Sequence, residues 1–179
     1  MKVLLILFIS FSLLSCGNNV LKTMYQAHRD TYNTDELRSK SLQSKLEFRN
    51  KLRKKVFSDQ NLEKIRSYTL IEKNSMEGVI GCFKSQDRVV QFWYDYFDKT
   101  IEYDEECEFN EDLFDFFKQN NQQKLEGLSK KFPVFHMGTF VVFEVEKGRV
   151  SMKRLSEFNT IYVLDSIHGR PYKDEDIFK

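Results

Sequence analysis

Apolar residues recur with a helical spacing in the first third of the chain. Asn33 and Glu36 stand at the positions of a capping box, in which each side chain accepts a hydrogen bond from the backbone N–H of the other residue. Apolar side chains then follow four to six residues apart, drifting around one helical face: Leu37, Leu42, Leu46, Leu52 and Val56. This spacing predicts a helix from residue 34 to about residue 57.

After residue 67 the pattern changes to one that is typical of strands. Segments rich in β-branched and aromatic residues predict strands at 68–71, 78–84, 88–97, 99–104, 137–145 and 149–155, with a turn at Lys147 and Gly148. The apolar run 160–164 suits a central, covered strand. Between these strands, Asn110 begins a second helical pattern that Pro133 ends, with apolar positions Leu113, Phe117, Leu125, Leu128 and Phe132.

This order of elements predicts the fold class. Helices first, then a meander, a helix and further strands indicate an α+β domain. We expect an antiparallel sheet of about five to seven strands, with an N-terminal helical segment and one inserted helix packed on it.

The N-terminal segment has the pattern of a secretory signal. Lys2 precedes an apolar stretch at 3–14 that is interrupted only by two serines. Twelve residues are too few to span a bilayer, which needs about 20 in a helix, but they match the apolar core of a signal peptide. An ordinary cleavage site has an A-x-A-like pattern, yet no alanine occurs before Ala27.

The end of this stretch, Leu13-Leu14-Ser15-Cys16, resembles the lipobox of bacterial lipoprotein signal peptides. The resemblance covers residues 1–19 only. It implies cleavage before Cys16, a diacylglyceryl group on the Cys16 thiol and usually an acyl group such as palmitate on its amine. Gly17 follows where an Asp is linked to inner-membrane retention in enteric bacteria, so the resemblance favours the outer membrane. An uncleaved anchor and a soluble secreted protein are the alternatives.

These features divide the chain into three parts. Residues 1–15 are the expected signal peptide. Residues 16–33 are polar and weakly patterned, and we expect a lipid-anchored tether with about one helical turn. Residues 34–179 form the single α+β domain, because no linker rich in Gly, Ser or Pro divides them.

Lipidation of Cys16 would leave Cys82 and Cys107 as the only other thiols, in an oxidising compartment. A disulfide between them would stabilise the protein by roughly 3 kcal/mol. A regular meander with turns at Gln86 and between residues 98 and 99 instead places both cysteines beside Val90, about 9–10 Å apart. A bridge tolerates roughly 7 Å between Cα atoms. A bulge or a crossing would change this register, so a disulfide and two separate buried thiols both stay open.

No pattern in the sequence indicates a catalytic residue, a metal site or a cofactor. The histidines His28, His136 and His168 do not stand at metal-ligand spacing, and we expect a solvated His28 in the tether. Asp165, Ser166 and His168 are triad residue types, but triads assemble from distant positions and no G-x-S-x-G motif occurs. Cys107 is flanked by acids that disfavour a nucleophilic thiolate: Glu105, Glu106 and Glu108.

Charge is segregated along the chain, although its formal net value is only +1 and gives no reason to expect nucleic acid. Between Asp95 and Asp115 lie ten acids and one base, Lys99. We interpret them as a solvated acidic face, with a divalent-ion site or paired hydrolase carboxylates as alternatives. The predicted first helix is basic, with Arg38, Lys40, Lys45, Arg49, Lys51, Arg53, Lys54 and Lys55. These cations either pair with the acidic segment or contact anionic lipid.

Alternation along the strand at 88–97 places Gln91, Trp93 and Asp95 on one face, which is the wetter one. An exposed Trp on a sheet is a possible binding surface, and cover by helices is the alternative.

Three classes of function follow from these observations. The scarcity of histidine and the absence of a nucleophile motif favour a non-enzymatic, lipid-anchored envelope protein that binds a protein partner, such as an assembly factor, an inhibitor or an immunity-type protein. The alternatives are an envelope hydrolase that uses carboxylates and a module that binds carbohydrate or peptide through Trp93.

Overall fold

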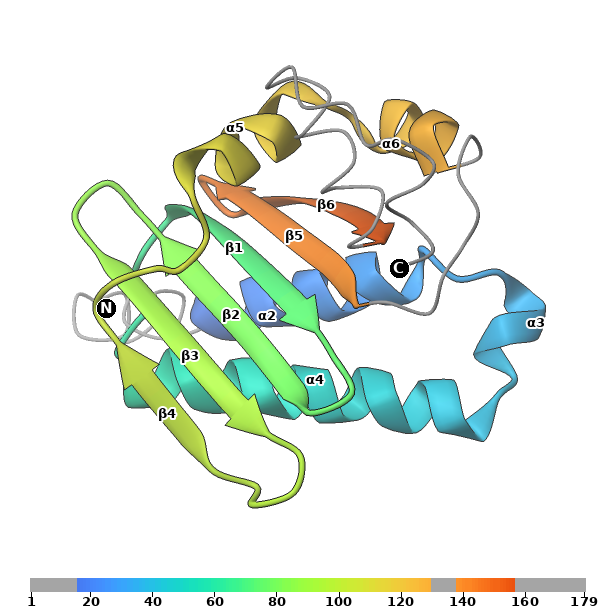
Figure 1. Ribbon diagram of the computed structural model, residues 1–179, viewed down its shortest axis with the longest axis horizontal. Helices are drawn as coiled ribbons and strands as arrows, with labels where there is room; N and C mark the ends of the chain where they lie inside the picture. The colour runs from blue at the N-terminus through green and yellow to red at the C-terminus, as the bar shows by residue number, and fades with distance from the viewer. Residues whose placement is uncertain (1–15, 130–137, 157–179) are drawn as a thin grey trace, which may run out of the picture. The chain divides into compact units, whose positions relative to one another are not determined.

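The computed structural model describes residues 16–129 and 138–156 (Figure 1). They form two compact units. The helical unit contains residues 16–68 and 144–152, and the sheet unit contains residues 69–129, 138–143 and 153–156. The predicted strand at 160–164 lies outside the described residues.

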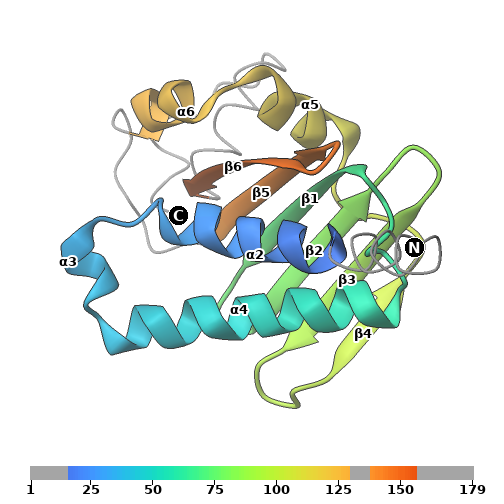
Figure 2. The same cartoon turned by 180° about the vertical axis from the view of Figure 1, so that it is seen from behind.

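The helical unit is built on α2 (Cys16–Arg29), α3 (Thr34–Leu37) and α4 (Lys40–Asp59). The long helices α2 and α4 lie side by side in opposite directions (Figure 2). α2 buries Leu21, Met24 and His28, which are spaced by three and four residues and therefore share one helical face. We expected a tether with one helical turn at 16–33. The structure instead has a helix of 14 residues there, because α4 supplies an apolar surface against which this sparse stripe is buried.

The predicted helix at 34–57 is divided in two. Asn33 forms the expected capping box with Glu36, but it caps only the single turn of α3. Ser39 caps the second helix, its hydroxyl accepting from the N–H of Leu42 at 3.4 Å. The side chain of Ser39 thus satisfies an N–H that a continuous helix would have bonded internally, and α4 begins afresh.

The strands form one antiparallel six-stranded sheet in the order β4-β3-β2-β1-β5-β6. Their bounds are β1 (Ser67–Asn74), β2 (Gly78–Lys84), β3 (Val89–Asp95), β4 (Ile101–Asp104), β5 (Thr139–Glu146) and β6 (Arg149–Ser156). The α+β class and the antiparallel sheet are therefore confirmed. β5 and β6 are joined at Lys147 and Gly148, which both have positive φ (50° and 81°) and so make the tight turn that the sequence predicts.

The inserted helix is also divided, into α5 (Glu111–Gln119) and α6 (Gln122–Ser129). Asn110 caps α5 as expected, with Oδ1 accepting from the N–H of Leu113 at 3.0 Å. The break falls at two asparagines. Asn120 has an extended backbone and donates to the carbonyl of Phe116 at 2.7 Å, while Asn121 Oδ1 accepts from the N–H of Lys124 at 2.9 Å. Side-chain bonds of this kind compete with the helical ladder.

The core of the sheet unit lies where these two helices pack on strands β1, β5 and β6 (Figure 1). Its buried members come from both layers: Ile71, Leu113, Phe116, Phe117, Leu125, Phe140, Val142 and Leu155. Lys153 on β6 is 8% exposed and donates to the carbonyl of Phe117, so the buried ammonium is hydrogen-bonded.

Two glycines allow β2 to lie close to β3. Gly81 pairs with Phe92, whose ring occupies the space that a Cβ would fill, with the nearest ring atom 2.0 Å from that position. At Gly78 an added Cβ would lie 2.0 Å from the carbonyl oxygen of Tyr94. A side chain at Gly78 would therefore force the two backbones apart, and one at Gly81 would displace the Phe92 ring.

Candidate functional site

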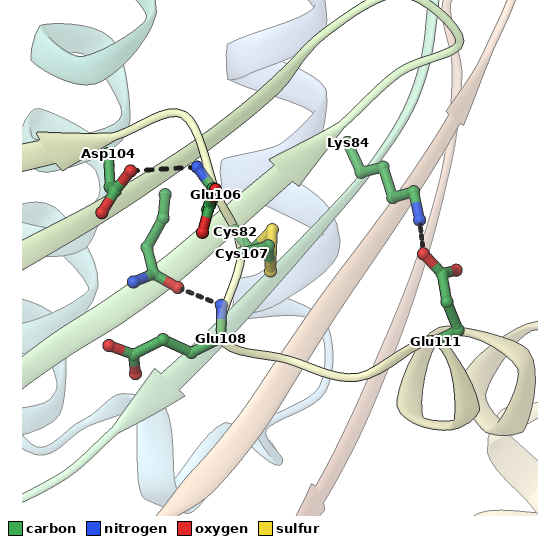
Figure 3. The surroundings of a disulfide bond; sticks show 8 residues. Cys82, Lys84, Asp104, Glu106, Cys107, Glu108 and Glu111 are labelled. Atoms are coloured by element: carbon green, nitrogen blue, oxygen red, sulfur yellow. Dashed lines mark hydrogen bonds and ion pairs between the residues drawn. A yellow bond between two sulfur atoms is a disulfide. The ribbon is translucent and has the colours of Figure 1, made fainter.

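Cys82 and Cys107 form a disulfide, with their Cα atoms 5.9 Å apart (Figure 3). Cys82 lies on β2 and is fully buried, whereas Cys107 is partly exposed and lies three residues beyond the end of β4. Of the two alternatives that the sequence leaves open, the structure has the bridge.

The expected register is wrong for both strand pairs, and β4 ends before it reaches Cys107. Cys82 pairs with Gln91, and Gln91 pairs with Asp104, the last residue of β4. The chain then leaves the sheet and turns back across β3, so Cys107 is not part of a ladder. The N–H of Glu106 donates to Asp104 Oδ1 at 3.0 Å, and the N–H of Glu108 donates to Gln91 Oε1 at 2.8 Å. We call residues 105–110 the crossing loop.

The three residues of the predicted binding surface share a face of β3 but have different surroundings. Gln91 is 8% exposed and bonded to the crossing loop. Asp95 accepts from the N–H groups of Phe97 and Asp98 at 2.6 and 3.0 Å, which shapes the turn after β3. Trp93 is half-buried and pairs with Ile80 on β2 and Glu102 on β4. Binding through Trp93 stays a prediction.

Two exposed apolar side chains, Met76 and Phe97, lie at one end of the sheet unit. Among the described residues, the large hydrophobic side chains that are exposed are Met76 (85%), Phe97 (78%) and Tyr103 (36%). Met76 lies in the β1–β2 turn, and Phe97 lies in the β3–β4 turn. The N–H of Tyr96 donates to the carbonyl of Glu77 at 2.9 Å, so these two turns are neighbours. No pattern in the sequence indicates that these two turns are neighbours, because this depends on the pairing of β2 with β3.

Both turns are held by local hydrogen bonds. The hydroxyl of Ser75 accepts from the N–H groups of Glu77 and Gly78 at 3.3 and 3.2 Å. The Tyr96 hydroxyl donates to Asn74 Oδ1 at 2.6 Å and thereby ties one turn to the other. The exposed apolar side chains are thus carried on ordered backbone.

Exposed carboxylates follow the chain from the β3–β4 turn along β4 and through the crossing loop into α5. Exposed acids in residues 98–112 are Asp98, Glu102, Asp104, Glu105, Glu106, Glu108, Glu111 and Asp112. Glu111 is paired with Lys84 (Figure 3). The Nζ of Lys84 also lies 5.0 Å from the centroid of the Phe114 ring. Within the described residues, no group of three or more His, Cys, Asp or Glu side chains is placed to hold a metal ion. Exposed carboxylates of this kind are suited to attracting cationic groups.

Two expectations about charged residues are wrong in the helical unit. His28 is 3% exposed, not solvated, and its Nδ1 lies 3.2 Å from Nη2 of Arg53. Arg49 and Arg53 are 5% and 1% exposed, so two of the eight cations of the predicted basic helix lie inside the unit. The lysines of α4 are exposed: Lys40, Lys45, Lys51, Lys54 and Lys55.

Tyr68 is also buried in the helical unit. Its hydroxyl donates to Sδ of Met24 at 3.6 Å, and its ring packs edge-on against Phe57 at 5.6 Å between centroids. Burial raises the pKa of Tyr68 above its usual value, because the phenolate would lose its hydration.

Several residues named from the sequence lie outside the described residues. These are the signal segment 1–15, His136 and the cluster Asp165, Ser166 and His168. Cys16 is the first residue of α2. Among the helices of the described residues, none combines the length and the apolar character that a membrane span requires.

The chain was compared with family models, with curated proteins and with solved structures, and no match was found in any of the three.

Proposed function

We propose that this is a lipid-anchored protein of the bacterial cell envelope that binds a protein partner without catalysis, as an assembly factor, an inhibitor or an immunity-type protein does. The observation that carries the proposal is the Leu13-Leu14-Ser15-Cys16 stretch at the end of a short apolar run. Cys16 is the site of lipid attachment. Two or more acyl chains would hold the protein on a membrane, where a single chain does so only marginally.

The disulfide supports the proposed location of the protein in the cell envelope. Bridges between cysteines persist in secreted and periplasmic proteins and are rare in the cytosol of mesophiles. Cys82 and Cys107 are bridged in the structure, which agrees with a domain that is exported before it functions. Gly17 after the lipidated cysteine favours the outer membrane over the inner membrane.

The surface of the sheet unit supports partner binding over catalysis. Met76 and Phe97 are largely exposed on neighbouring, ordered turns. Large apolar side chains held in this way are typical of interaction sites, because their burial by a partner removes apolar area from water. Carboxylates at the rim would select partners of opposite charge.

Lipidation is tested by expressing the full chain in a bacterial host that is fed a clickable fatty acid. The wild-type protein should carry the label and fractionate with the outer membrane. The matched variant Cys16→Ser should lose the label and leave the membrane fraction. A wild-type protein without label, or a variant that keeps it, would refute the anchor.

Partner binding is tested with the Cys16→Ser form, which lacks the lipid. Cross-linking in a purified envelope extract, followed by mass spectrometry, should recover one stoichiometric protein partner. Turnover that is abolished by a single carboxylate substitution would instead support the hydrolase alternative. Glycan binding that is lost in Trp93→Ala would support the carbohydrate module.

A further inference from the structure

β4 is the last strand of the sheet on one side, and no other described strand pairs with its outer edge. The hydrogen bonds to β3 alternate along an antiparallel pair. The N–H of Asp95 donates to the carbonyl of Thr100 at 3.2 Å, and the register continues to Glu102 opposite Trp93. The backbone of Ile101, between these bonded positions, therefore directs its N–H and its C=O away from β3.

The side chains of this edge have a regular arrangement. Glu102 and Asp104 lie on the face that carries Trp93, while Ile101 and Tyr103 lie on the opposite face. Residues 95–108, from the end of β3 through β4 into the crossing loop, contain seven acids and one base. The edge therefore combines the outward backbone groups of Ile101, two carboxylates on one face, and Ile101 with Tyr103 on the other face.

We propose that the outer edge of β4 accepts an extended segment of a protein partner as an added strand, and that this segment alternates basic and apolar residues. Lys or Arg side chains of the segment would lie beside Glu102 and Asp104, and its apolar side chains would lie beside Ile101 and Tyr103. Strand addition takes its affinity from main-chain bonds and its specificity from alternate side chains. This inference rests on the proposed function of partner binding and names the chemistry of the partner.

The charge argues against two other occupants of the same edge. A second copy pairing antiparallel through β4 would bring Glu102 and Asp104 beside the same carboxylates of its twin, and like charges directly opposite destabilise a strand pair. A membrane with anionic lipids would be repelled by the same groups.

The disulfide prepares this edge for binding. Cys107 is tied to β2 and the N–H of Glu108 to Gln91, so the crossing loop is fixed immediately after β4. At the other end of the strand, Asp95 fixes the turn that carries Phe97. Because both ends of β4 are fixed in the free protein, an added strand would order little additional chain.

The probe is a blocked hexapeptide of alternating Lys and Val, titrated into the Cys16→Ser form and followed by fluorescence anisotropy. Trp93, the only tryptophan of the chain, gives a second readout one strand away from the binding edge. The Lys-Val peptide should bind, and its affinity should fall with added salt. A Glu-Val peptide should not bind, and neither should a Lys-Val peptide that is N-methylated at alternate residues, because it lacks the main-chain donors.

Variants of the protein test the same edge. Ile101→Pro should weaken binding at least about tenfold, because proline removes the outward N–H that the added strand would bond. The variant should still fold, since an edge strand tolerates proline where its missing N–H faces outward. Glu102→Lys with Asp104→Lys should reverse the preference to the Glu-Val peptide. Glu126→Lys is the control for charge, since Glu126 is an exposed acid on α6, and it should leave binding nearly unchanged.

Two results of the peptide titration would overturn the inference: no binding of the Lys-Val peptide, or equal binding of its N-methylated form. Both are measured on the Cys16→Ser form without any further substitution. A partner that cross-links in the envelope but binds elsewhere would remove this docking surface and leave the proposed function standing. Absence of any partner, with the peptide still bound, would instead remove the proposed partner-binding function and keep the edge as a peptide site.

Discussion

The disulfide should contribute a large part of the stability of the sheet unit. Cys82 and Cys107 are 25 residues apart in the sequence. The chain-entropy relation for a loop of this length predicts about 3.5 kcal/mol at 25 °C, because the bridge removes loop conformations from the unfolded chain. Reduction of the wild-type protein should lower the free energy of unfolding by this amount.

A double substitution, Cys82→Ala with Cys107→Ser, should cost slightly more than reduction. Cys82 is fully buried, so loss of its sulfur leaves a small void that adds about 1 kcal/mol. Gln91→Ala is the matched control, because it removes the hydrogen bond to the crossing loop and leaves the bridge intact. It should cost about 1 kcal/mol.

The assay is urea unfolding of the Cys16→Ser form, with and without reductant, followed by far-ultraviolet circular dichroism. With a slope of about 2 kcal/mol per molar urea, the transition midpoint should fall by about 1.8 M on reduction. A shift below about 0.5 M would refute the entropic argument. Two free thiols in the denatured, unreduced protein would refute the bridge itself.

Three further predictions concern glycine contacts, a buried phenol and a buried cation. In the same urea assay, Gly78→Ala should lower the free energy of unfolding by about 1–3 kcal/mol, because an added Cβ meets strand backbone. Gly127→Ala on helix α6 should raise it by about 0.5–1 kcal/mol, because nothing lies within 4 Å of the added Cβ and alanine favours the helix. Burial raises the pKa of Tyr68, so the stability that its protonated form contributes is complete below pH 10 and is lost as the pH rises further. Wild type should therefore lose up to about 1.4 kcal/mol per pH unit more than Tyr68→Phe above pH 10, and parallel curves would refute this. Arg53→Ala should cost about 2–4 kcal/mol because Arg53 is 1% exposed, while its exposed neighbour Lys54→Ala should stay within about 0.5 kcal/mol; equal effects would contradict the burial.

Local signals in the sequence predicted local structure well. Asn33 and Asn110 begin helices because their side chains satisfy N–H groups within three residues. The segment 78–84 is a strand over its whole predicted length, and Lys147 with Gly148 makes the predicted turn. Each of these outcomes depends on residues that are neighbours in the chain.

Other signals needed knowledge of distant partners. The spacing of Leu21, Met24 and His28 is visible in the sequence, but three positions in a polar segment indicate a stable helix only when α4 is present to cover them. Arg49 and Arg53 read as part of a basic helix that pairs with the acidic segment or contacts anionic lipid, yet their positions on α4 coincide with its buried side. Periodicity alone does not distinguish a buried arginine from an exposed one.

The candidate site shows the same division. The sequence by itself determined the acidic character of residues 95–115, the aromatic strand around Trp93 and the lipobox-like stretch before Cys16, because these are properties of composition and short-range order. Only the tertiary structure decided that β4 ends at Asp104, that the chain then crosses back to join Cys107 to Cys82, and that β4 lies at the edge of the sheet. Where a strand ends and which strand flanks it depend on contacts between residues far apart in the chain, and no local pattern contains them.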